Sequence, residues 1–335
     1  MLKSLCCVLP LCIGLLACES DSAQQFIPEG NDGFTIAILP DTQGYSQFYP
    51  EIWQAQTDWL ADNANLLNVK IVIHVGDLVE GSWRADQWQV AQDKMGILTQ
   101  AQVPFIIAPG NHDYGAIRDS RNARDRSTLL DQYFPLQSFE AMQTFGGVYP
   151  EAGRVDNSYH TFEAGGSKWL VLALEFGPRD ALLDWANEIV LAHADHKVIV
   201  ATHAYLYPDG TRYDWASKGA DQAHSPHTYG IAESPEGLND GQEMWDKFVS
   251  RHSNIVAVVS GQVLDDGLGY QVSQGAGQVH EMVANYQSYD FAGDGYLRLL
   301  QFDDENKKAW VRSYSPFRDS AFRDEANQFR FSYEQ

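Results

Sequence analysis

Residues suited to metal binding and acid–base chemistry gather at three points of the chain, each directly after an apolar run. The three clusters are Asp41-Thr42-Gln43 after residues 34–39, Asp77 with Glu80 after residues 69–75, and Asn111-His112-Asp113 after residues 105–109. Apolar runs closed by Pro or Gly are typical of buried strands, and open α/β sheets bind ligands at the carboxyl ends of their strands. Carboxylate and amide oxygens bind hard cations, and an imidazole can act as an acid or a base near neutral pH. The spacing therefore predicts one site assembled from three strand ends.

The elements that must position this site show helical periodicity between the strands. Ile52, Ala55, Trp59 and Leu66 predict one helix, and Trp88, Ala91, Met95 and Leu98 predict another. Together with the apolar runs they give a β-α-β-α-β order, which favours a right-handed parallel sheet. A third helix is expected over residues 182–192. After an expected strand over residues 255–259, the chain up to about residue 314 alternates apolar and polar residues, which suggests a second, antiparallel sheet.

In order and spacing, these clusters and Thr202-His203, which follows a further apolar run, resemble the calcineurin-like metallophosphoesterases. The motifs Asp41-Thr42-Gln43, Asn285-Tyr286-Gln287 and Tyr314-Ser315-Pro316 resemble those of an exported bacterial branch of that family. The resemblance extends over residues 34–316. It implies an α/β fold in which a two-sheet sandwich is flanked by helices, and hydrolysis of phosphomonoesters or phosphodiesters by a metal-activated water.

The resemblance also implies a role for each site residue. The metal ligands would be Asp41, Gln43, Asp77, Asn111, His203 and Gln262. His112 would donate a proton to the leaving oxygen, and Glu80 would accept a hydrogen bond from His112 and fix its orientation. The expected cofactor is a divalent metal (Mn, Mg, Fe or Zn), with one firm site and a second, weaker one.

Two departures from the family pattern leave two functions open. Gln43 stands where the family usually has His, and Gly261-Gln262-Val263-Leu264 replaces the late Gly-His-x-His motif. The amide oxygen of Gln262 can ligate a metal, whereas Leu264 cannot. The first function is a metal-dependent phosphoesterase. The alternative is a catalytically weakened lipoprotein that acts as a binding module at the cell envelope. The remaining ligands and the acid–base pair favour hydrolysis.

Residues 205–240 form the longest stretch without apolar periodicity, and long irregular loops in compact domains are usually functional or disordered. Because this stretch directly follows His203, we expect it to form a wall of the substrate pocket. The candidate pocket residues are Tyr205, His224, His227, Asn285 and Gln287. His74 and His280 are expected to be structural. The arginines between residues 118 and 126 can either meet a phosphate or pair with neighbouring aspartates, and pairing is favoured.

The amino terminus predicts export. Residues 1–17 form a signal peptide, and Leu15-Leu16-Ala17-Cys18 resembles a lipobox, so Cys18 is expected to carry a lipid anchor. The alternative is an ordinary secretory signal that contains a cysteine. We expect a flexible tether over residues 18–32, one domain over residues 33–316 and a C-terminal tail over residues 317–335. The expected location is the outer membrane, facing the periplasm or the cell surface.

Cysteine usage and charge exclude some kinds of site and partner. The other three cysteines lie within the signal, which excludes disulfides and Cys-ligated zinc from the mature protein if Cys18 is acylated. A net charge of −22 argues against a nucleic-acid partner. The expected partners are a small phosphorylated substrate and, through the anchor, the membrane.

Overall fold

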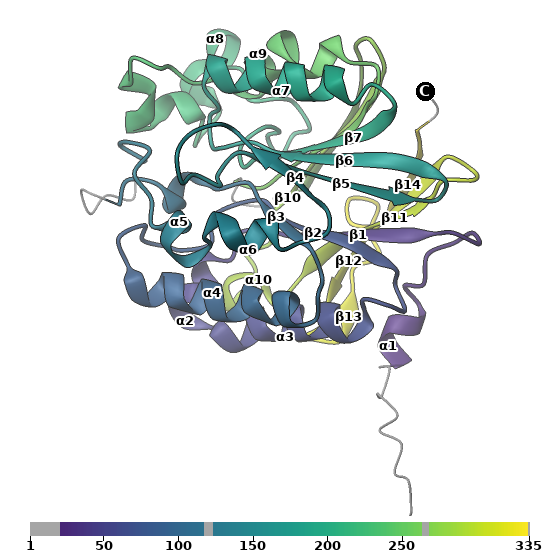
Figure 1. The fold of residues 1–335 in the computed structure, drawn as a ribbon. Coiled ribbons are helices and arrows are strands. Elements are labelled where there is room, and N and C mark those ends of the chain that lie inside the picture. The colour runs from purple at the N-terminus through teal and green to yellow at the C-terminus, as the bar shows by residue number, and fades with distance from the viewer. Residues whose placement is uncertain (1–20, 117–122, 263–267, 334–335) are drawn as a thin grey trace, which may run out of the picture.

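The computed structural model describes residues 21–116, 123–262 and 268–333. Two mixed β-sheets pack face to face, with helices on the outer face of each, so the chain forms the two-sheet sandwich predicted above (Figure 1). The signal peptide, Cys18, Val263 and Leu264 lie outside the described residues.

The first sheet contains the three strands that precede the polar clusters. Its strands are β1 (Phe34–Leu39), β2 (Val69–His74), β3 (Phe105–Ile107), β11 (Leu297–Asp303), β12 (Lys308–Ser315), β13 (Ser320–Ala321) and β14 (Phe329–Ser332). Across the sheet they lie in the order β13-β12-β11-β1-β2-β3, and β14 also pairs with β12. Strands β1, β2 and β3 are parallel, and helices α3 (Pro50–Asn63) and α4 (Ala85–Gln100) connect them. The predicted β-α-β-α-β unit is therefore present. A short helix, α2 (Gln43–Phe48), follows β1.

The second sheet has a parallel centre. Its order is β4-β5-β6-β7-β8-β10-β9, with strands β4 (Phe145–Val148), β5 (Ser158–Ala164), β6 (Ser167–Ala173), β7 (His196–Ala201), β8 (Ile255–Ser260), β9 (Leu268–Gln274) and β10 (Gln278–Ala284). Strands β6, β7, β8 and β10 run parallel. Helices α7 (Asp180–Ala192) and α9 (Gly241–Lys247) precede β7 and β8 and lie on the outer side of the sandwich (Figure 1).

Smaller helices complete the structure. The segment 205–240 contains α8 (Trp215–Lys218), η2 (Gly219–Asp221), η3 (Pro226–Thr228) and η4 (Gly230–Glu233). The others are α1 (Asp21–Gln24), η1 (Asn111–Asp113), α5 (Leu130–Tyr133), α6 (Leu136–Glu140), η5 (Val249–Arg251) and α10 (Asp290–Gly293). In the part of the chain that the structure covers, no helix has the length and apolar character needed to cross a membrane.

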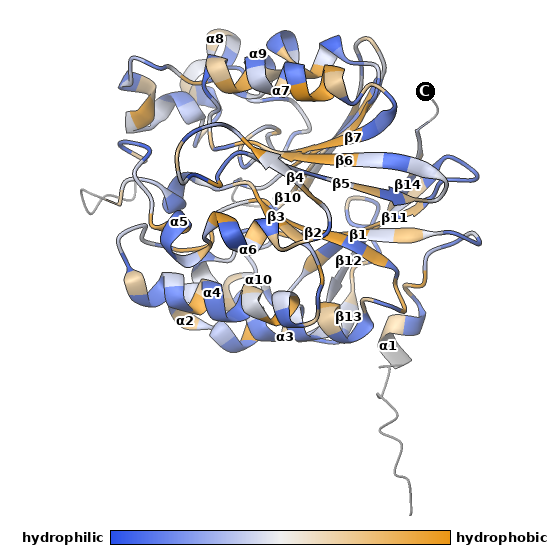
Figure 2. Cartoon of the chain, viewed as in Figure 1, coloured by the Kyte–Doolittle hydropathy of each residue, from blue (hydrophilic) through white to orange (hydrophobic). Residues whose placement is uncertain are grey.

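The core explains why β1 is apolar along its whole length. Phe34, Ile36 and Ile38 face the second sheet, where they belong to the cluster that includes Trp169. The intervening Ala37 and Leu39 face α3 and α4 on the other side. Since successive side chains of a strand point to opposite faces, a strand buried on both faces must be apolar throughout. Figure 2 shows this apolar centre between the sheets and the more polar outer surfaces of the helices.

The C-terminal strands correct two predictions. Strands β11 and β12 are antiparallel as expected, but they extend the first sheet, because β11 pairs with β1. The predicted tail from residue 317 is wrong: β13 and β14 both pair with β12, and Tyr333 is buried. The alternating pattern identified these strands but not the sheet edge that they join.

The N-terminal strap, residues 23–29, corrects the predicted flexible tether. Phe26 is buried, and its ring lies 4.8 Å from that of Tyr314 and 6.1 Å from that of Trp59. The carbonyl oxygens of Gln25 and Phe26 accept hydrogen bonds from Arg312 and Gln301. The polar composition of residues 18–32 predicted a free chain, but one phenylalanine and two carbonyl groups bind this part of it to the first sheet.

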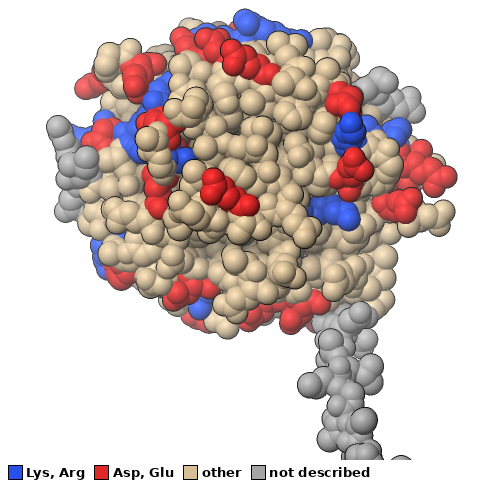
Figure 3. Space-filling view, viewed as in Figure 1, with Lys and Arg blue, Asp and Glu red and all other residues tan. Residues whose placement is uncertain are grey.

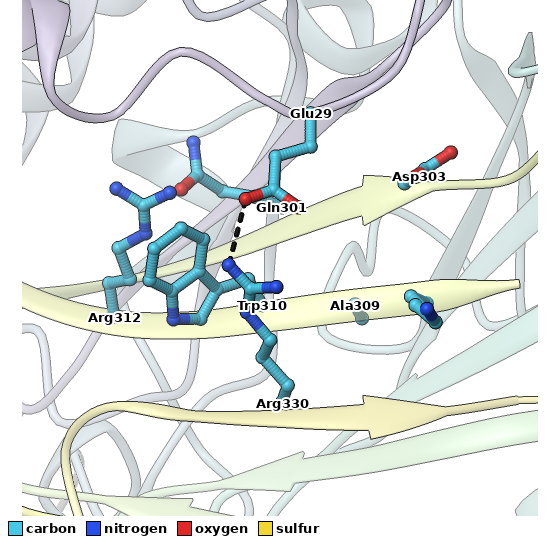
Figure 4. A pocket seen from close by; sticks show the side chains of 8 residues that line it. Glu29, Gln301, Asp303, Ala309, Trp310, Arg312 and Arg330 are labelled. Carbon is cyan, nitrogen blue, oxygen red and sulfur yellow. Dashed lines mark hydrogen bonds and ion pairs between the residues drawn. The ribbon is translucent and has the colours of Figure 1, made fainter. Parts of the chain in front are cut away.

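Two arginines that stack on Trp310 also contact the strap. Arg312 and Arg330 lie 3.3 and 4.0 Å from the ring of Trp310, and Arg330 forms a 2.8 Å ion pair with Glu29 of the strap (Figure 4). Cation–π contacts of this kind contribute about 0.5–1 kcal/mol each at exposed sites. Elsewhere, on the face shown in Figure 3, acidic and basic side chains are interspersed.

Candidate metal centre

The carboxyl ends of five strands, drawn from both sheets, meet at one place. Asp41 follows β1, Asp77 follows β2, Asn111 follows β3, His203 follows β7 and Gln262 follows β8. Asp41, Asp77 and His203 each present a ligand atom, and these three atoms lie within 4.8 Å of one another.

Distances from the imidazole of His203 define the centre of this group. Its Nε2 lies 3.1 Å from Asn111 Oδ1, 3.4 Å from Asp77 Oδ2 and 3.7 Å from Asp41 Oδ1. All four side chains are buried. The structure therefore brings together four of the six predicted ligands around one atom.

A strained turn after β2 places Asp77. Its φ is +52°, and the preceding Gly76 has φ +103°. A Cβ on Gly76 would lie 2.5 Å from the amide nitrogen of Gly110 and 2.6 Å from Nδ1 of His203. A residue with a left-handed backbone costs free energy and persists only where its surroundings enforce it, most often at functional sites.

Asp113 supports this turn, a role that the sequence analysis did not assign. Its carboxylate accepts hydrogen bonds from the backbone N–H groups of Gly110 (2.8 Å) and Leu78 (2.9 Å). It therefore joins the loop after β2 to the loop after β3. Burial, together with the neighbouring charge of Asp77, raises the pKa of Asp113 to about 7.

The buried carboxylates of the site interact strongly with its histidines, as the shifts of their pKa values indicate. Burial raises the pKa of Asp41 to about 7. Burial alone would also raise the pKa of Asp77, but His203 and His112 outweigh it and hold that pKa below its usual value. Burial alone would lower the pKa of His203, whereas Asp77 and Asp41 raise it to about 10. Two buried carboxylates thus face one buried imidazole, and a bound divalent cation would supply positive charge among them.

Three of the predicted ligands have a buried oxygen without a hydrogen-bond partner. These atoms are Asp41 Oδ2, Gln43 Oε1 and Gln262 Oε1. A buried polar atom left unpaired costs about 1–3 kcal/mol, so three in one site indicate a missing partner. A bound cation is a partner that carboxylate and amide oxygens accept. The donor set is one imidazole nitrogen with carboxylate and amide oxygens, which suits Mg²⁺ or Mn²⁺.

His203 is already oriented for ligation. Its Nδ1–H donates to the backbone carbonyl of Val75 at 2.6 Å, which leaves Nε2 facing the other ligands. A second hydrogen bond of this kind commonly fixes the tautomer of a metal-binding histidine. His74, by contrast, is structural as predicted: Nε2 lies 3.0 Å from Thr42 Oγ1, and Nδ1 accepts from the N–H of Gly76.

The catalytic pair is adjacent to the ligands, with one change from the prediction. The backbone N–H of His112 donates to Asp77 Oδ1 at 2.9 Å. Its Nδ1–H donates to the main-chain carbonyl of Glu80 at 2.9 Å, while the carboxylate of Glu80 is 3.6 Å away. Glu80 therefore orients His112 chiefly through its backbone. Burial would lower the pKa of His112, but Asp77 and Glu80 outweigh it and raise that pKa above its usual value.

Two of the candidate pocket residues, Gln287 and His224, contact predicted ligands, and a third, Asn285, contacts Gln287. Gln287 Oε1 accepts from Nε2 of Gln43 at 2.6 Å, and Asn285 Oδ1 accepts from the N–H of Gln287 at 2.9 Å. The carbonyl of His224 accepts from Nε2 of Gln262 at 3.1 Å. These contacts place Asn285 and Gln287 beside the site and bring segment 205–240 against it.

The other two pocket candidates lie elsewhere. Tyr205 is buried in the core of the second sheet, where its hydroxyl accepts from Arg212 at 3.2 Å. His227 bonds Glu243 at 2.9 Å and stacks on Trp215. Neither is brought to the metal ligands, because segment 205–240 folds back on itself and only part of it reaches the site. Tyr229, which the sequence analysis did not identify, does reach the site and accepts from Nε2 of Gln262 at 3.1 Å.

The remaining candidates have structural partners. His280 Nε2 donates to the carbonyl of Ser332 at 2.9 Å. Arg126 pairs with a carboxylate as favoured above, but the partner is the buried Glu175, at 2.8 Å, instead of a surface aspartate. Arg126 also donates to the carbonyl of Phe176.

Comparison with known proteins gives a family and a related fold. Residues 34–264 match the family model described as "Calcineurin-like phosphoesterase". A Bacillus subtilis (strain 168) protein named "Uncharacterized protein YvnB" is 31% identical over 304 residues, which cover 88% of this chain and 21% of that protein. The chain thus spans about a fifth of the length of that curated relative.

Solved structures give a further comparison. One is the purple acid phosphatase PPD1 from yellow lupin (Lupinus luteus) seeds, with a TM-score of 0.51 and 13% identity, covering 91% of this chain and 55% of that chain. The other is Plasmodium GAP50, titled "the anchor in the inner membrane complex", with a TM-score of 0.46 and 11% identity over 91% of this chain and 90% of that one. At this identity, the likeness to the lupin enzyme shows a shared fold.

Proposed function

The chain belongs to the calcineurin-like phosphoesterase family, and from that premise we propose that it hydrolyses phosphomonoesters or phosphodiesters with the help of a bound divalent metal. The observation that carries the proposal is the set of buried donors at the strand ends, in which three oxygens from Asp41, Gln43 and Gln262 lack a hydrogen-bond partner. A protein that had lost its metal function would gain stability by replacing such atoms.

The residues divide into those that would hold metal and those that act on the substrate. The metal would be held by Asp41, Gln43, Asp77, Asn111, His203 and Gln262. When bound, a divalent ion neutralises charge on the phosphoryl oxygens and lowers the pKa of a coordinated water.

His112 supplies the proton that the leaving oxygen needs. Its Nδ1–H is engaged by the carbonyl of Glu80, so Nε2 is the atom that can donate to a substrate. Asp77 and Glu80 raise its pKa above the usual value, which favours the protonated form required of a general acid. The bond from its backbone N–H to Asp77 holds it beside the ligands.

We further propose that the protein works outside the cytoplasm, anchored to the outer membrane through a lipid on Cys18. The supporting features are the apolar stretch of residues 1–17 and the lipobox-like Leu15-Leu16-Ala17-Cys18. The net charge of −22 favours a small phosphorylated substrate over a nucleic acid. Cys18→Ser should abolish lipid incorporation and release the protein from the membrane fraction; unchanged membrane association would refute the anchor.

The first experiment is elemental analysis of the purified protein, paired with hydrolysis of an aryl phosphate monoester and diester in the presence of Mn²⁺. Bound metal with turnover is the expected result, and the ratio of the two rates would show whether monoesters or diesters are preferred. A folded protein that binds no metal and turns over neither ester would refute the proposal and support the binding-module function.

A further inference from the structure

Gln262 occupies the strand end where the family usually has a ligating imidazole. Its backbone has φ +76°, and its N–H donates to Asp41 Oδ1 at 3.2 Å. The side chain is buried, and both protons of its amide are used: Nε2 donates to the carbonyl of His224 and to the hydroxyl of Tyr229, each at 3.1 Å. The amide oxygen, Oε1, is buried and has no hydrogen-bond partner.

These two acceptors determine which end of the amide lies in the site. A main-chain carbonyl can only accept, so an amide oxygen turned toward His224 would face another oxygen and lose a hydrogen bond. The nitrogen must therefore point to segment 205–240, and the oxygen is left for the ligand cluster that contains Asp41. Groups that fix the orientation of a ligand in this way are typical of metal sites.

The ring of Tyr229 is itself fixed against a metal ligand. Phe176 packs edge-on against Tyr229, with centroids 5.0 Å apart and an interplanar angle of 83°. The same phenylalanine packs against the imidazole of His203, with centroids 5.9 Å apart. One aromatic side chain thus packs against both Tyr229 and His203.

We infer that Tyr229 and the main-chain carbonyl of His224 are positioning groups, which aim the amide oxygen of Gln262 at the metal in place of the missing imidazole. This inference rests on the proposed function. It assigns a task to the part of segment 205–240 that reaches the site. It also assigns the site an oxygen donor, which favours Mg²⁺ or Mn²⁺ over Zn²⁺ relative to an imidazole at the same place.

The test is a double-mutant cycle on Mn²⁺ affinity, measured by isothermal titration calorimetry. Tyr229→Phe removes the hydroxyl and keeps the ring that packs on Phe176. We expect it to weaken Mn²⁺ binding by about 10-fold or more, the usual cost of removing a group that orients a ligand. In a Gln262→Ala background, Tyr229→Phe should cause no further loss, because there is no amide left to orient.

Tyr270→Phe is the matched control. The hydroxyl of Tyr270 on β9 donates to Nδ1 of His280 on β10 at 2.8 Å, outside segment 205–240. Its removal should leave Mn²⁺ affinity unchanged. Circular dichroism melting curves would confirm that each variant is folded.

The outcomes separate this inference from the proposed function. Additive losses in the cycle, or an equal loss in the Tyr270→Phe control, would overturn the positioning role while wild-type metal binding and turnover still supported the hydrolase. A wild-type protein that binds no Mn²⁺ would overturn both.

Discussion

Replacing His112 by Asn separates proton donation from the other tasks of this residue. The bond from its backbone N–H to Asp77 is independent of the side chain. The amide nitrogen of Asn can still donate to the carbonyl of Glu80, which now accepts from Nδ1 at 2.9 Å. The substitution therefore keeps the local hydrogen bonds and removes the acidic Nε2.

The size of the effect should depend on the leaving group. General acid catalysis contributes about 10²–10⁴-fold to the rate, or about 2.7–5.4 kcal/mol of transition-state stabilisation. A phenol with nitro substituents leaves without protonation, whereas an alkoxide needs a proton. We therefore expect the full loss of kcat/KM on an alkyl phosphate and a small loss on a nitrophenyl phosphate.

The pH profile gives a second signature. Because Asp77 and Glu80 raise the pKa of His112, its acidic form persists to higher pH than in an ordinary histidine and is lost as the pH rises through that pKa. The wild-type rate of alkyl ester hydrolysis should therefore fall as the pH rises, which gives the pH profile a basic limb. This limb should be missing in His112→Asn.

Glu80→Gln is the control for this experiment. It keeps the main-chain acceptor and removes one negative charge, so the limb should move to lower pH with only a modest loss of rate. Equal losses on both esters, or a basic limb that survives in His112→Asn, would refute the general-acid role.

Three further predictions address the ligands and the strap. Asp77→Asn should abolish metal binding and all turnover, measured by elemental analysis and ester hydrolysis; undiminished activity would refute the mechanism. Gln262→His should increase both the Zn²⁺ affinity and the rate, because an imidazole nitrogen replaces an amide oxygen; an unchanged affinity would show that this side chain does not contact the ion. Phe26→Ala should lower the free energy of unfolding by about 3–5 kcal/mol in a urea titration, the usual cost of deleting a buried Phe ring; a loss near zero would mean that the strap is not docked in solution.

The part of the fold that holds the site could be predicted from the sequence because its signals are local. An apolar run closed by Pro or Gly fixes where β1, β2 and β3 end, and Asp41, Asp77 and Asn111 follow within a few residues of each end. Parallel pairing then brings these residues together without any further information.

Features that depend on distant partners could not be predicted. Strands β11 and β12 alternate like any antiparallel pair, and nothing in that pattern specifies β1 as the neighbour of β11. The polar residues around Phe26 resemble a linker, and only the pocket beside Tyr314 makes that ring part of the core. Tyr229 lies in a segment without periodicity, so its contact with Gln262 has no local signal.

The pairing of β1 with β11 constrains how the chain reaches its folded state. Strand β1 lies inside the first sheet, and its residues pair with partners as far along the chain as Phe302, opposite Phe34. Until β11 has been synthesised, β1 has a bare edge of unpaired backbone groups on an apolar six-residue strand, a template for aggregation. The strap closes even later, since its partner Arg312 lies 287 residues beyond Gln25. Completing the first sheet is therefore a late step in folding, and a chain that ends before β11 should expose this edge and aggregate.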